Sequence, residues 1–226
     1  ILARTGGQVK TAHCLGAGEN DSAAQYARGA LQLGILFAVL YGLVSLFGAS
    51  RLIGFFKLNS PEVIVQAEWY VRIACGFVLF SYLNAILTGL LTAAGNSRTP
   101  FIVNVAGLVF NVVLDPVLIF GIGPFPKMGI RGAALSTVLG YALSMVIAFL
   151  LLVFTKQKVR IKIKGFHVDS HMLKNLFSYG FPSFVMNALG SFMLTFTNLF
   201  LTAYSDTVVA FFGAYFKVQQ MIFMTV

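Results

Sequence analysis

The sequence predicts an all-α polytopic membrane protein, on two observations. Of its 226 residues, 58% are hydrophobic and only 10% are charged, whereas soluble proteins carry about 25% charged residues. Long runs without any charge also recur along the chain, and each reaches the roughly 20 residues that a helix needs to cross a hydrocarbon core of about 30 Å. A soluble domain, a disordered chain and a disulfide scaffold are therefore excluded, and Cys14 and Cys75 form no metal-binding spacing.

Five complete transmembrane helices are expected, with partial helices at both ends. Uncharged runs cover residues 29–50, 73–97, 132–155 and 175–205, and residues 99–120 form a span interrupted only by Asp115. The first dozen residues are expected to finish an earlier helix before a turn at 16–18, and a further span begins at 207. Helices are expected because backbone groups in a bilayer must satisfy their own hydrogen bonds. Both ends of the chain, which lacks an initiator Met, indicate a piece of a longer protein.

Basic residues indicate the orientation of the spans. Of the 16 Lys and Arg residues, six lie close together between the fourth and fifth spans: Lys156, Lys158, Arg160, Lys162, Lys164 and Lys174. Cytoplasmic loops carry an excess of Lys and Arg, so residues 156–174 are expected to form a cytoplasmic linker. Alternation of the spans then places ten basic residues inside and five outside. The net charge of +9 is thereby attributed to topology and anionic lipid, with no role in binding nucleic acid.

Asp115 is the most informative residue inside a span. A carboxylate within the membrane is costly and is by default a functional candidate. Asn111 lies one helical turn before it and Asn104 eleven residues before it, so all three share one helix face. Such a carboxylate can load and release a proton. The alternative is a carboxylate that only anchors a neighbouring helix through hydrogen bonds.

Further stripes follow helical spacing. Polar side chains recur on the second span (Asn84, Thr88, Thr92) and on the fifth (Ser183, Asn187, Ser191, Thr195, Asn198, Thr202). Such stripes line a watery cavity or hold helices together. On the fourth span the small residues Gly132, Ser136, Gly140, Ser144 and Ala148 predict close helix packing. Near the C-terminal end, Lys217 is expected close to the membrane midplane, on one helix side with Gln220, Met221 and Met224.

Catalytic and metal-binding patterns are not found. His167 and His171 are four residues apart, but a zinc site needs further ligands. No phosphate-binding loop is present, because no Gly-Lys-Ser/Thr follows Gly16-Ala-Gly18. The chain is therefore not expected to be an enzyme or to hold a metal or an organic cofactor.

An ordered set of motifs resembles the multidrug and toxic compound extrusion (MATE) transporters. The motifs are Gly16-Ala-Gly18 with the helix start at Asp21, Leu90-Leu-Thr-Ala-Ala-Gly-Asn-Ser-Arg-Thr-Pro100, Asn111-Val-Val-Leu-Asp-Pro-Val-Leu-Ile-Phe-Gly121, Gly129-Ile-Arg-Gly-Ala-Ala-Leu-Ser-Thr137 and Tyr179-Gly-Phe-Pro-Ser183. The resemblance implies twelve helices in two lobes around a cavity that opens alternately to each side. Residues 1–155 would belong to the N-lobe, from the end of helix 2 to helix 6, and residues 175–226 would begin the C-lobe with helix 7 and part of helix 8. The stretch Met186-Asn-Ala-Leu-Gly190 lacks the Glu of some branches, so the chain looks more like the MepA and DinF-like branches.

The resemblance also implies a function and its residues. Asn111 and Asp115 match the cation-coupling pair of the N-lobe, and Thr137 or Ser136 matches a neighbouring hydroxyl. The substrate cavity is expected at Asn84, Thr88, Asn187, Ser191, Asn198, Lys217, Gln220, Met221 and Met224. The expected activity is antiport, in which bulky and often cationic drugs leave in exchange for H⁺ or Na⁺. The protein is expected to be a monomer in the bilayer of a bacterial plasma membrane. The alternatives are a lipid-linked oligosaccharide flippase of the same superfamily, a membrane-embedded enzyme and a scaffold protein.

Overall fold

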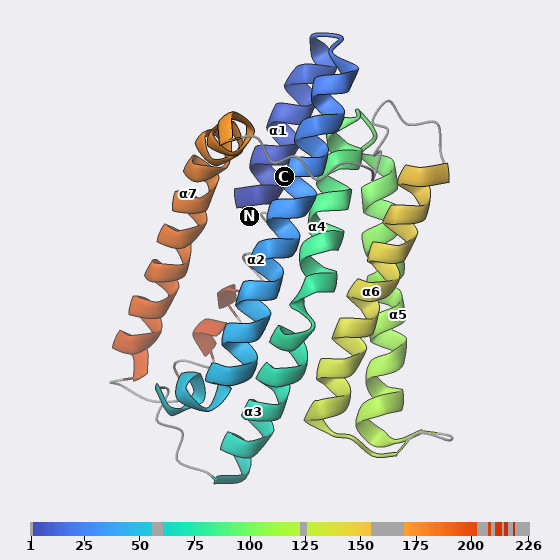
Figure 1. The fold of residues 1–226 in the computed structure, drawn as a ribbon. Coiled ribbons are helices and arrows are strands. Elements are labelled where there is room, and N and C mark those ends of the chain that lie inside the picture. Colours follow the sequence, from blue (N-terminus) through green and yellow to red (C-terminus); the bar gives the residue numbers. More distant parts are fainter. Residues whose placement is uncertain are drawn as a thin grey trace. The chain divides into compact units, whose positions relative to one another are not determined.

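The computed structural model describes residues 2–55, 61–122, 126–154 and 170–202, with residues 208, 211–213, 215, 216 and 219 beyond them. Regular structure in these ranges is helical throughout, which confirms the all-α prediction (Figure 1). The helices are α1 (Leu2–Gly16), α2 (Asn20–Phe55), α3 (Pro61–Gly76), α4 (Val78–Ala93), α5 (Arg98–Phe120), α6 (Ile130–Phe154) and α7 (Ser170–Thr202). The chain divides into two compact units, Ile1–Phe181 and Pro182–Val226.

Among the described residues, four helices could cross a membrane, or up to five spans are present if a bent pair counts as one, against the five expected. Within the described residues, α2, α5, α6 and α7 are each long and apolar enough to cross a membrane, and α3 with α4 makes a fifth span if the bent pair is counted as one. α1 ends at Gly16, and the chain turns back through Gly18, whose φ of 78° favours glycine. α7 begins at Ser170, so the last five residues of the predicted linker are helical. The rest of that linker lies outside the described residues.

The second span is not the uninterrupted helix that the run 73–97 suggested. α3 and α4 are separated at Phe77 and bent by 42°. α4 ends before Gly95, whose φ of 84° is left-handed. The side chain of Asn96 then accepts a hydrogen bond from the Thr99 N–H at 3.1 Å at the start of α5. A run of uncharged residues indicates hydrophobicity but does not indicate that the helix is continuous. The run 73–97 therefore contains both the break at Phe77 and the turn at Gly95.

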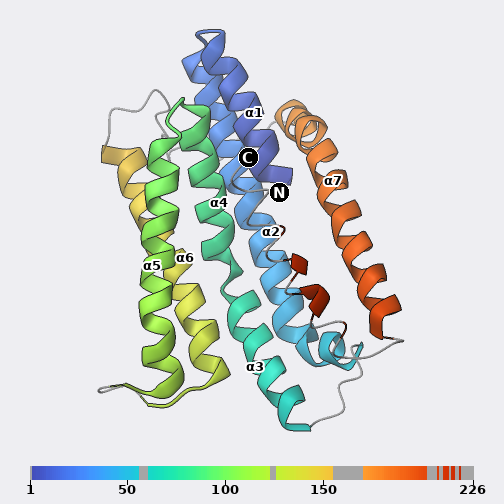
Figure 2. The same cartoon turned by 180° about the vertical axis from the view of Figure 1, so that it is seen from behind.

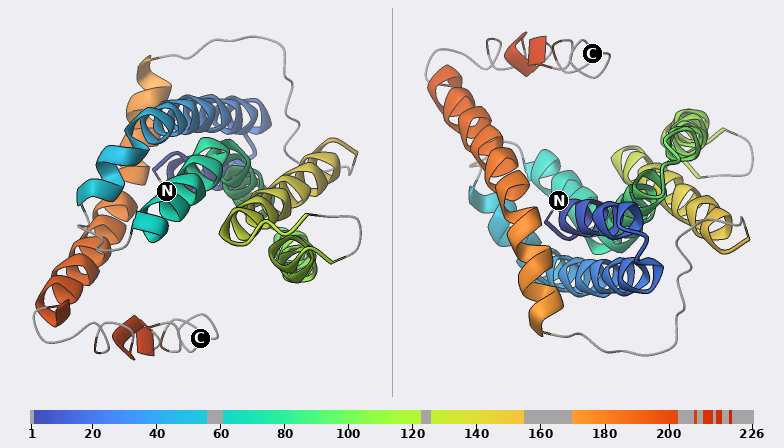
Figure 3. Two further views of the ribbon diagram at one scale, coloured as in Figure 1. Left: turned by 90° about the horizontal axis from the view of Figure 1, so that it is seen from below. Right: turned by 90° about the horizontal axis from the view of Figure 1, so that it is seen from above.

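α4 is the centre of the first unit. Leu90 of α4 belongs to a buried cluster with side chains of α1, α2 and the first turns of α7, while Leu91 belongs to a second cluster with side chains of α5 and α6. Viewed along its length, α4 lies between α2 on one side and the α5–α6 pair on the other (Figure 3). Adjacent positions on α4 thus face the two halves of this unit, and a single helix holds both together.

The ends of the helices in the first unit follow the predicted alternation. The α1–α2 turn, the α4–α5 turn and the last described residue of α6 lie at one end, and the α5–α6 connection lies at the other (Figures 1 and 2). At the first end, Lys10 lies over the rings of Tyr26 and Tyr179 at 5.5 and 5.1 Å from the ring centroids. At the opposite end, the Arg131 guanidinium lies 4.3 Å from the ring centroid of Trp69. These cation–π contacts tie the first turns of α7 to α1 and α2, and α3 to α6.

α5 and α6 approach closely through glycine. A Cβ atom on Gly107 would lie 2.8 Å from the carbonyl oxygen of Gly140 and would overlap the Ser144 hydroxyl. A Cβ on Gly140 would in turn lie 3.0 Å from the Gly107 oxygen. The Ser144 hydroxyl donates a hydrogen bond across this contact to the Val103 carbonyl at 3.2 Å. All five members of the small-residue stripe of α6 are buried, which confirms its predicted packing role.

The contact predicts that Gly107 tolerates no side chain. We expect Gly107→Val in the full-length protein to lower the free energy of unfolding by about 1–3 kcal/mol, because the added methyl groups would force α5 and α6 apart. Denaturation in detergent measures the change. Gly48→Val is the matched control, since a Cβ on Gly48 of α2 meets no atom within 4 Å. Equal losses in the two variants would contradict the close approach.

Candidate functional site

The Ser136 hydroxyl lies at the centre of the candidate site. It donates a short hydrogen bond to Asp115 Oδ1, and it accepts one from Asn111 Nδ2 at 3.3 Å. The side chain of Ser136 is fully buried, whereas Asn111 and Asp115 are partly exposed. Asn111 and Asp115 project from adjacent turns of α5, as their spacing predicted, and Ser136 is supplied by α6. The arrangement joins the two helices through a titratable group.

Glycines on α6 create the room for this contact. Gly132 and Gly140 lie one turn before and one turn after Ser136. A Cβ on Gly132 would lie 2.6 Å from the Leu118 carbonyl oxygen of α5, and one on Gly140 would lie 3.2 Å from Asn111 Cβ. A serine side chain is short, so its hydroxyl reaches Asp115 only because the two backbones are this close. The packing stripe and the polar site are therefore one structural feature.

The Ser136 hydroxyl has two possible acceptors for its single hydrogen. Besides Asp115, the carbonyl oxygen of Ala133 in its own helix lies at 2.9 Å. An ionised Asp115 accepts the hydrogen of Ser136. A protonated Asp115 has its own O–H to donate, so it can donate to Ser136, which then donates to Ala133 instead. The Ser136 hydroxyl can therefore donate either across to α5, at Asp115, or within α6, at Ala133.

The sequence left open whether Ser136 or Thr137 supplies the hydroxyl next to Asn111 and Asp115. The Thr137 hydroxyl donates to the Ala133 carbonyl at 2.9 Å within its own helix, and Ser136 is the one that contacts Asp115. The oxygens of Asp115, Asn111 and Ser136 are hard ligands of the kind that alkali and alkaline-earth ions prefer. No group of three or more His, Cys, Asp or Glu residues that could hold a metal ion occurs in the described part of the chain.

A second polar contact joins α5 to α4. Asn84 Nδ2 of α4 donates to Asn104 Oδ1 of α5 at 3.1 Å. Asn104 lies two turns before Asn111 on α5, and it contacts α4 whereas Asn111 contacts α6. Asn84 is buried, and its Oδ1 has no hydrogen-bond partner among the described residues. Thr88, one turn after Asn84 on α4, is also buried, and its hydroxyl donates to the Asn84 carbonyl at 2.7 Å. The pairing of Asn84 with Asn104 was not expected from the sequence, although both belonged to predicted polar stripes.

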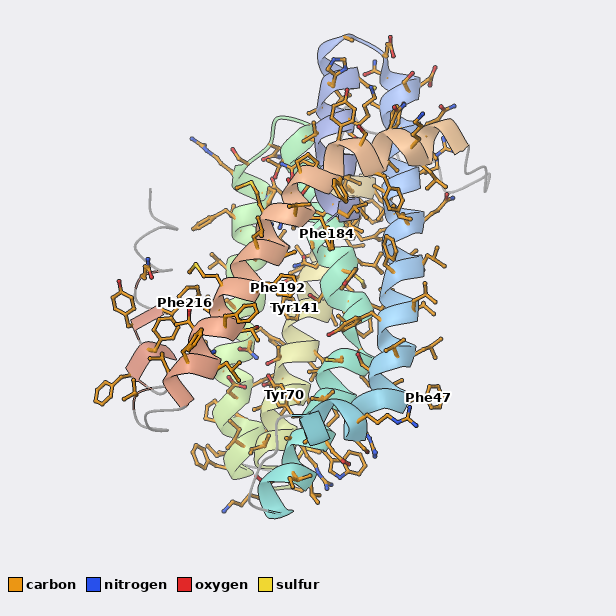
Figure 4. All side chains as sticks on the ribbon, turned by 90° about the vertical axis from the view of Figure 1, so that its left-hand side faces the viewer. Phe47, Tyr70, Tyr141, Phe184, Phe192 and Phe216 are labelled. Atoms are coloured by element: carbon orange, nitrogen blue, oxygen red, sulfur yellow. The ribbon has the colours of Figure 1, made fainter. Side chains whose placement is uncertain are left out.

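The polar stripe of α7 beyond Pro182 belongs to the second unit. Asn187 and Ser191 are exposed and donate to backbone carbonyls four residues earlier in the same helix, at 2.8 and 3.0 Å. Phe184 and Phe192 of this segment are 48% and 62% exposed (Figure 4). Ser191 thus uses its single donor, and Asn187 one of its two, within the helix, and the exposed face also carries aromatic surface. Asn198 lies further along the same helix and is partly exposed.

Some candidates fall outside the described part of the chain. They are Lys217, Gln220, Met221, Met224 and the side chains of His167 and His171. One lining polar pair was missed in the sequence: Arg28 and Gln32 border a pocket between α2, α4 and α6. Two polar residues one turn apart, where the uncharged run 29–50 begins, were the signal that could have indicated it.

Comparison with known sequences identifies similar proteins. The MatE family profile matches residues 1–117. The probable multidrug resistance protein NorM of Thermotoga maritima is 29% identical over 205 residues, which cover 90% of this chain and 44% of that protein. The multidrug export protein MepA of Staphylococcus aureus is 28% identical, covering 82% of this chain and 50% of that protein. The chain thus spans about half the length of the curated relatives it matches.

Solved structures agree on the fold. The inward-facing structure of a multidrug resistance MATE family transporter of the MOP superfamily matches with a TM-score of 0.83 at 22% identity, over 97% of this chain and 49% of the other. A crystal structure of MATE in complex with MaL6 matches with a TM-score of 0.84 at 25% identity, over 97% of this chain and 48% of the other. Both cover nearly all of the chain, so the helical arrangement is that of this fold.

The hydrogen bonds predict unequal roles for the two neighbouring hydroxyls. We expect Ser136→Ala to lower the free energy of unfolding by about 1–3 kcal/mol, because Asn111 loses its acceptor and Asp115 its donor. Thr137→Ala removes only a bond within α6 and is expected to cost about 1 kcal/mol or less. Denaturation of the two full-length variants in the same detergent makes the comparison. A Thr137→Ala loss as large as that of Ser136→Ala would contradict the assignment.

Proposed function

This chain belongs to the MatE family, and on that basis we propose that it is part of a secondary antiporter that exports bulky, often cationic drugs in exchange for H⁺ or Na⁺. The names of its relatives, multidrug resistance and multidrug export proteins, support the drug-efflux part of the proposal. The observation that carries the coupling part is the hydrogen-bonded contact of Asp115 with Ser136 and Asn111 between α5 and α6.

Coupling requires that the cation bind the two conformational states with different affinity, since a ligand shifts an equilibrium only by its differential affinity. The Ser136 hydroxyl provides such a difference. When Asp115 is ionised, it accepts the hydroxyl hydrogen, and when it is protonated that hydrogen is released towards Ala133. A Na⁺ ion would compete for the same oxygens. Cation occupancy therefore changes the bonding between α5 and α6, and this change would bias their relative position.

Drug binding is proposed for the polar and aromatic face of α7 beyond Pro182, and for Asn84 and Thr88 of α4, which are buried in this structure. On α7, Asn187 and Ser191 each donate one hydrogen bond within the helix, and their side-chain oxygens can accept from the N–H groups of a cationic drug. Phe184 and Phe192 add exposed aromatic surface, which attracts cations as well as apolar rings. The unpartnered Oδ1 of Asn84 would be a further acceptor in a conformation that exposes it. These two candidate drug-binding positions lie in different units. Each is proposed independently of the other.

The proposal predicts that Asp115→Asn uncouples transport. The amide keeps the shape of the side chain but cannot ionise, so we expect drug resistance of cells expressing the full-length protein to fall by at least about fivefold, the lower range of allosteric couplings. Growth inhibition by a panel of cationic dyes and drugs measures it.

Asp21→Asn serves as the control, because Asp21 lies exposed in the first turn of α2 and outside the site. Membrane insertion of both variants is checked by the yield of folded protein. Full resistance with Asp115→Asn would refute the coupling role.

The driving ion is tested separately in membrane vesicles. Dye efflux by the full-length protein is expected under an imposed pH gradient, a sodium gradient or both, and Asp115→Asn should abolish the response to either. ATP-driven efflux without any ion gradient would contradict antiport. Indifference to dyes together with binding of polyprenyl-phosphate sugars would favour a flippase instead.

A further inference from the structure

A pocket of about 420 Å³ lies between α2, α4 and α6. Its wall includes Arg28, Gln32 and Ile35 of α2, Leu87 of α4, and Met145 and Phe149 of α6. Among the described residues, α2 and α6 both pack on α4 and not on each other, so the pocket is a groove over α4 with these two helices as its sides. Apart from Arg28 and Gln32, its lining is apolar. The volume lies within the range of about 300–1,000 Å³ that is usual for small-molecule sites.

The charged part of the groove lies near one membrane surface. Arg28 follows the start of α2 at Asn20 by eight residues, which is about 12 Å along the helix at 1.5 Å per residue. The same end of the unit carries the α1–α2 and α4–α5 turns (Figures 1 and 2) and Arg98 at the start of α5. By the excess of Lys and Arg in its connections, this end is the cytoplasmic one. Ile35 lies a further seven residues along α2, towards the membrane interior.

Arg28 and Gln32 form a polar pair inside an apolar groove. They are four residues apart and share one face of α2. Gln32 Oε1 is buried without a hydrogen-bond partner in the part of the chain that the structure describes. The groove therefore has the Arg28 side chain at its cytoplasmic end, a polar amide one turn deeper and apolar surface beyond.

We propose that this groove binds an anionic phospholipid of the cytoplasmic leaflet. Its phosphate lies at the Arg28 guanidinium, which can bind a phosphate through two parallel hydrogen bonds. One acyl chain lies beyond Gln32, along Ile35, Leu87 and Phe149. The order of charged, polar and apolar groups with depth is that of a phospholipid in its own leaflet. Basic pockets between transmembrane helices on the cytoplasmic side bind anionic headgroups in this way. The lipid site is separate from Asp115 and independent of the proposed antiport.

Titration of the purified full-length protein with defined lipids, followed by native mass spectrometry, tests the proposal. Dioleoyl-phosphatidylglycerol is expected to bind more tightly than dioleoyl-phosphatidylcholine, which has the same chains and no net charge. Arg28→Gln should lower the phosphatidylglycerol affinity about fivefold, the effect of about one basic residue at an anionic surface. It should lower the phosphatidylcholine affinity less, because the choline group of that lipid already balances the charge of its phosphate. Arg98→Gln is the matched control, since Arg98 is exposed at the same end and does not line the groove. Equal losses in the two variants would overturn the proposal in favour of general attraction to the leaflet.

The acyl chain has its own test. Ile35 is 43% exposed, so Ile35→Trp adds bulk to the groove without overpacking the core. We expect this variant to weaken both lipids while its thermal midpoint stays that of the wild type. Unchanged binding would overturn the proposal, and so would displacement of phosphatidylglycerol by a cationic dye, which would make the groove a drug site. If Arg28→Gln fails to fold, the Ile35→Trp variant still decides whether the groove binds a lipid acyl chain. Because binding is measured without transport, a negative result leaves the antiport proposal to its own experiments.

Discussion

The close approach of α5 and α6 is the constraint on which the polar site depends. Gly107 and Gly140 bring the two backbones so near that a Cβ on either would lie within 3.0 Å of the opposite carbonyl oxygen. At that separation the short side chain of Ser136 bridges to Asp115 and Asn111. A membrane offers no hydrophobic driving force between helices, so this packing and these hydrogen bonds are what hold the pair. The group that would respond to a cation is thus part of the helix contact itself.

α4 extends this arrangement to the rest of the first unit. Its buried side chains face both clusters, and Asn84 connects it to the same face of α5 that carries Asp115. A displacement of α5 therefore acts on two partners, α6 through Ser136 and α4 through Asn104. The break at Phe77 leaves the α3 half of this span with its own attachment, the contact between Trp69 and Arg131 of α6. Because its two halves are fixed to the bundle by different side chains, the bent span is held at both ends.

The outer surface of the first unit is apolar, as a bilayer requires. Phe47 of α2 projects away from the helix and is 87% exposed (Figure 4), and similar side chains cover much of α5 and α6. Exposed apolar surface of this extent would aggregate in water and is ordinary in lipid. Against this background the groove at Arg28 and Gln32 stands out, because it combines a charge with a concave apolar wall. The polar contacts at Asp115 and at Asn84 lie between helices, whereas Arg28 and Gln32 border the groove.

The sequence alone determined the class of protein, the five spans, the common face of Asn111 and Asp115, and the packing role of the small-residue stripe. These features follow from hydrophobicity and from the 3.6-residue period, which are properties of each segment by itself. Tertiary structure decided the rest. Ser136 and Thr137 are adjacent and project about 100° apart around α6, so only the rotation of α6 against α5 selects Ser136. The pairing of Asn84 with Asn104, the break at Phe77 and the groove at Arg28 likewise depend on which helix faces meet. That choice is made by packing between segments far apart in the chain, and no single segment encodes it.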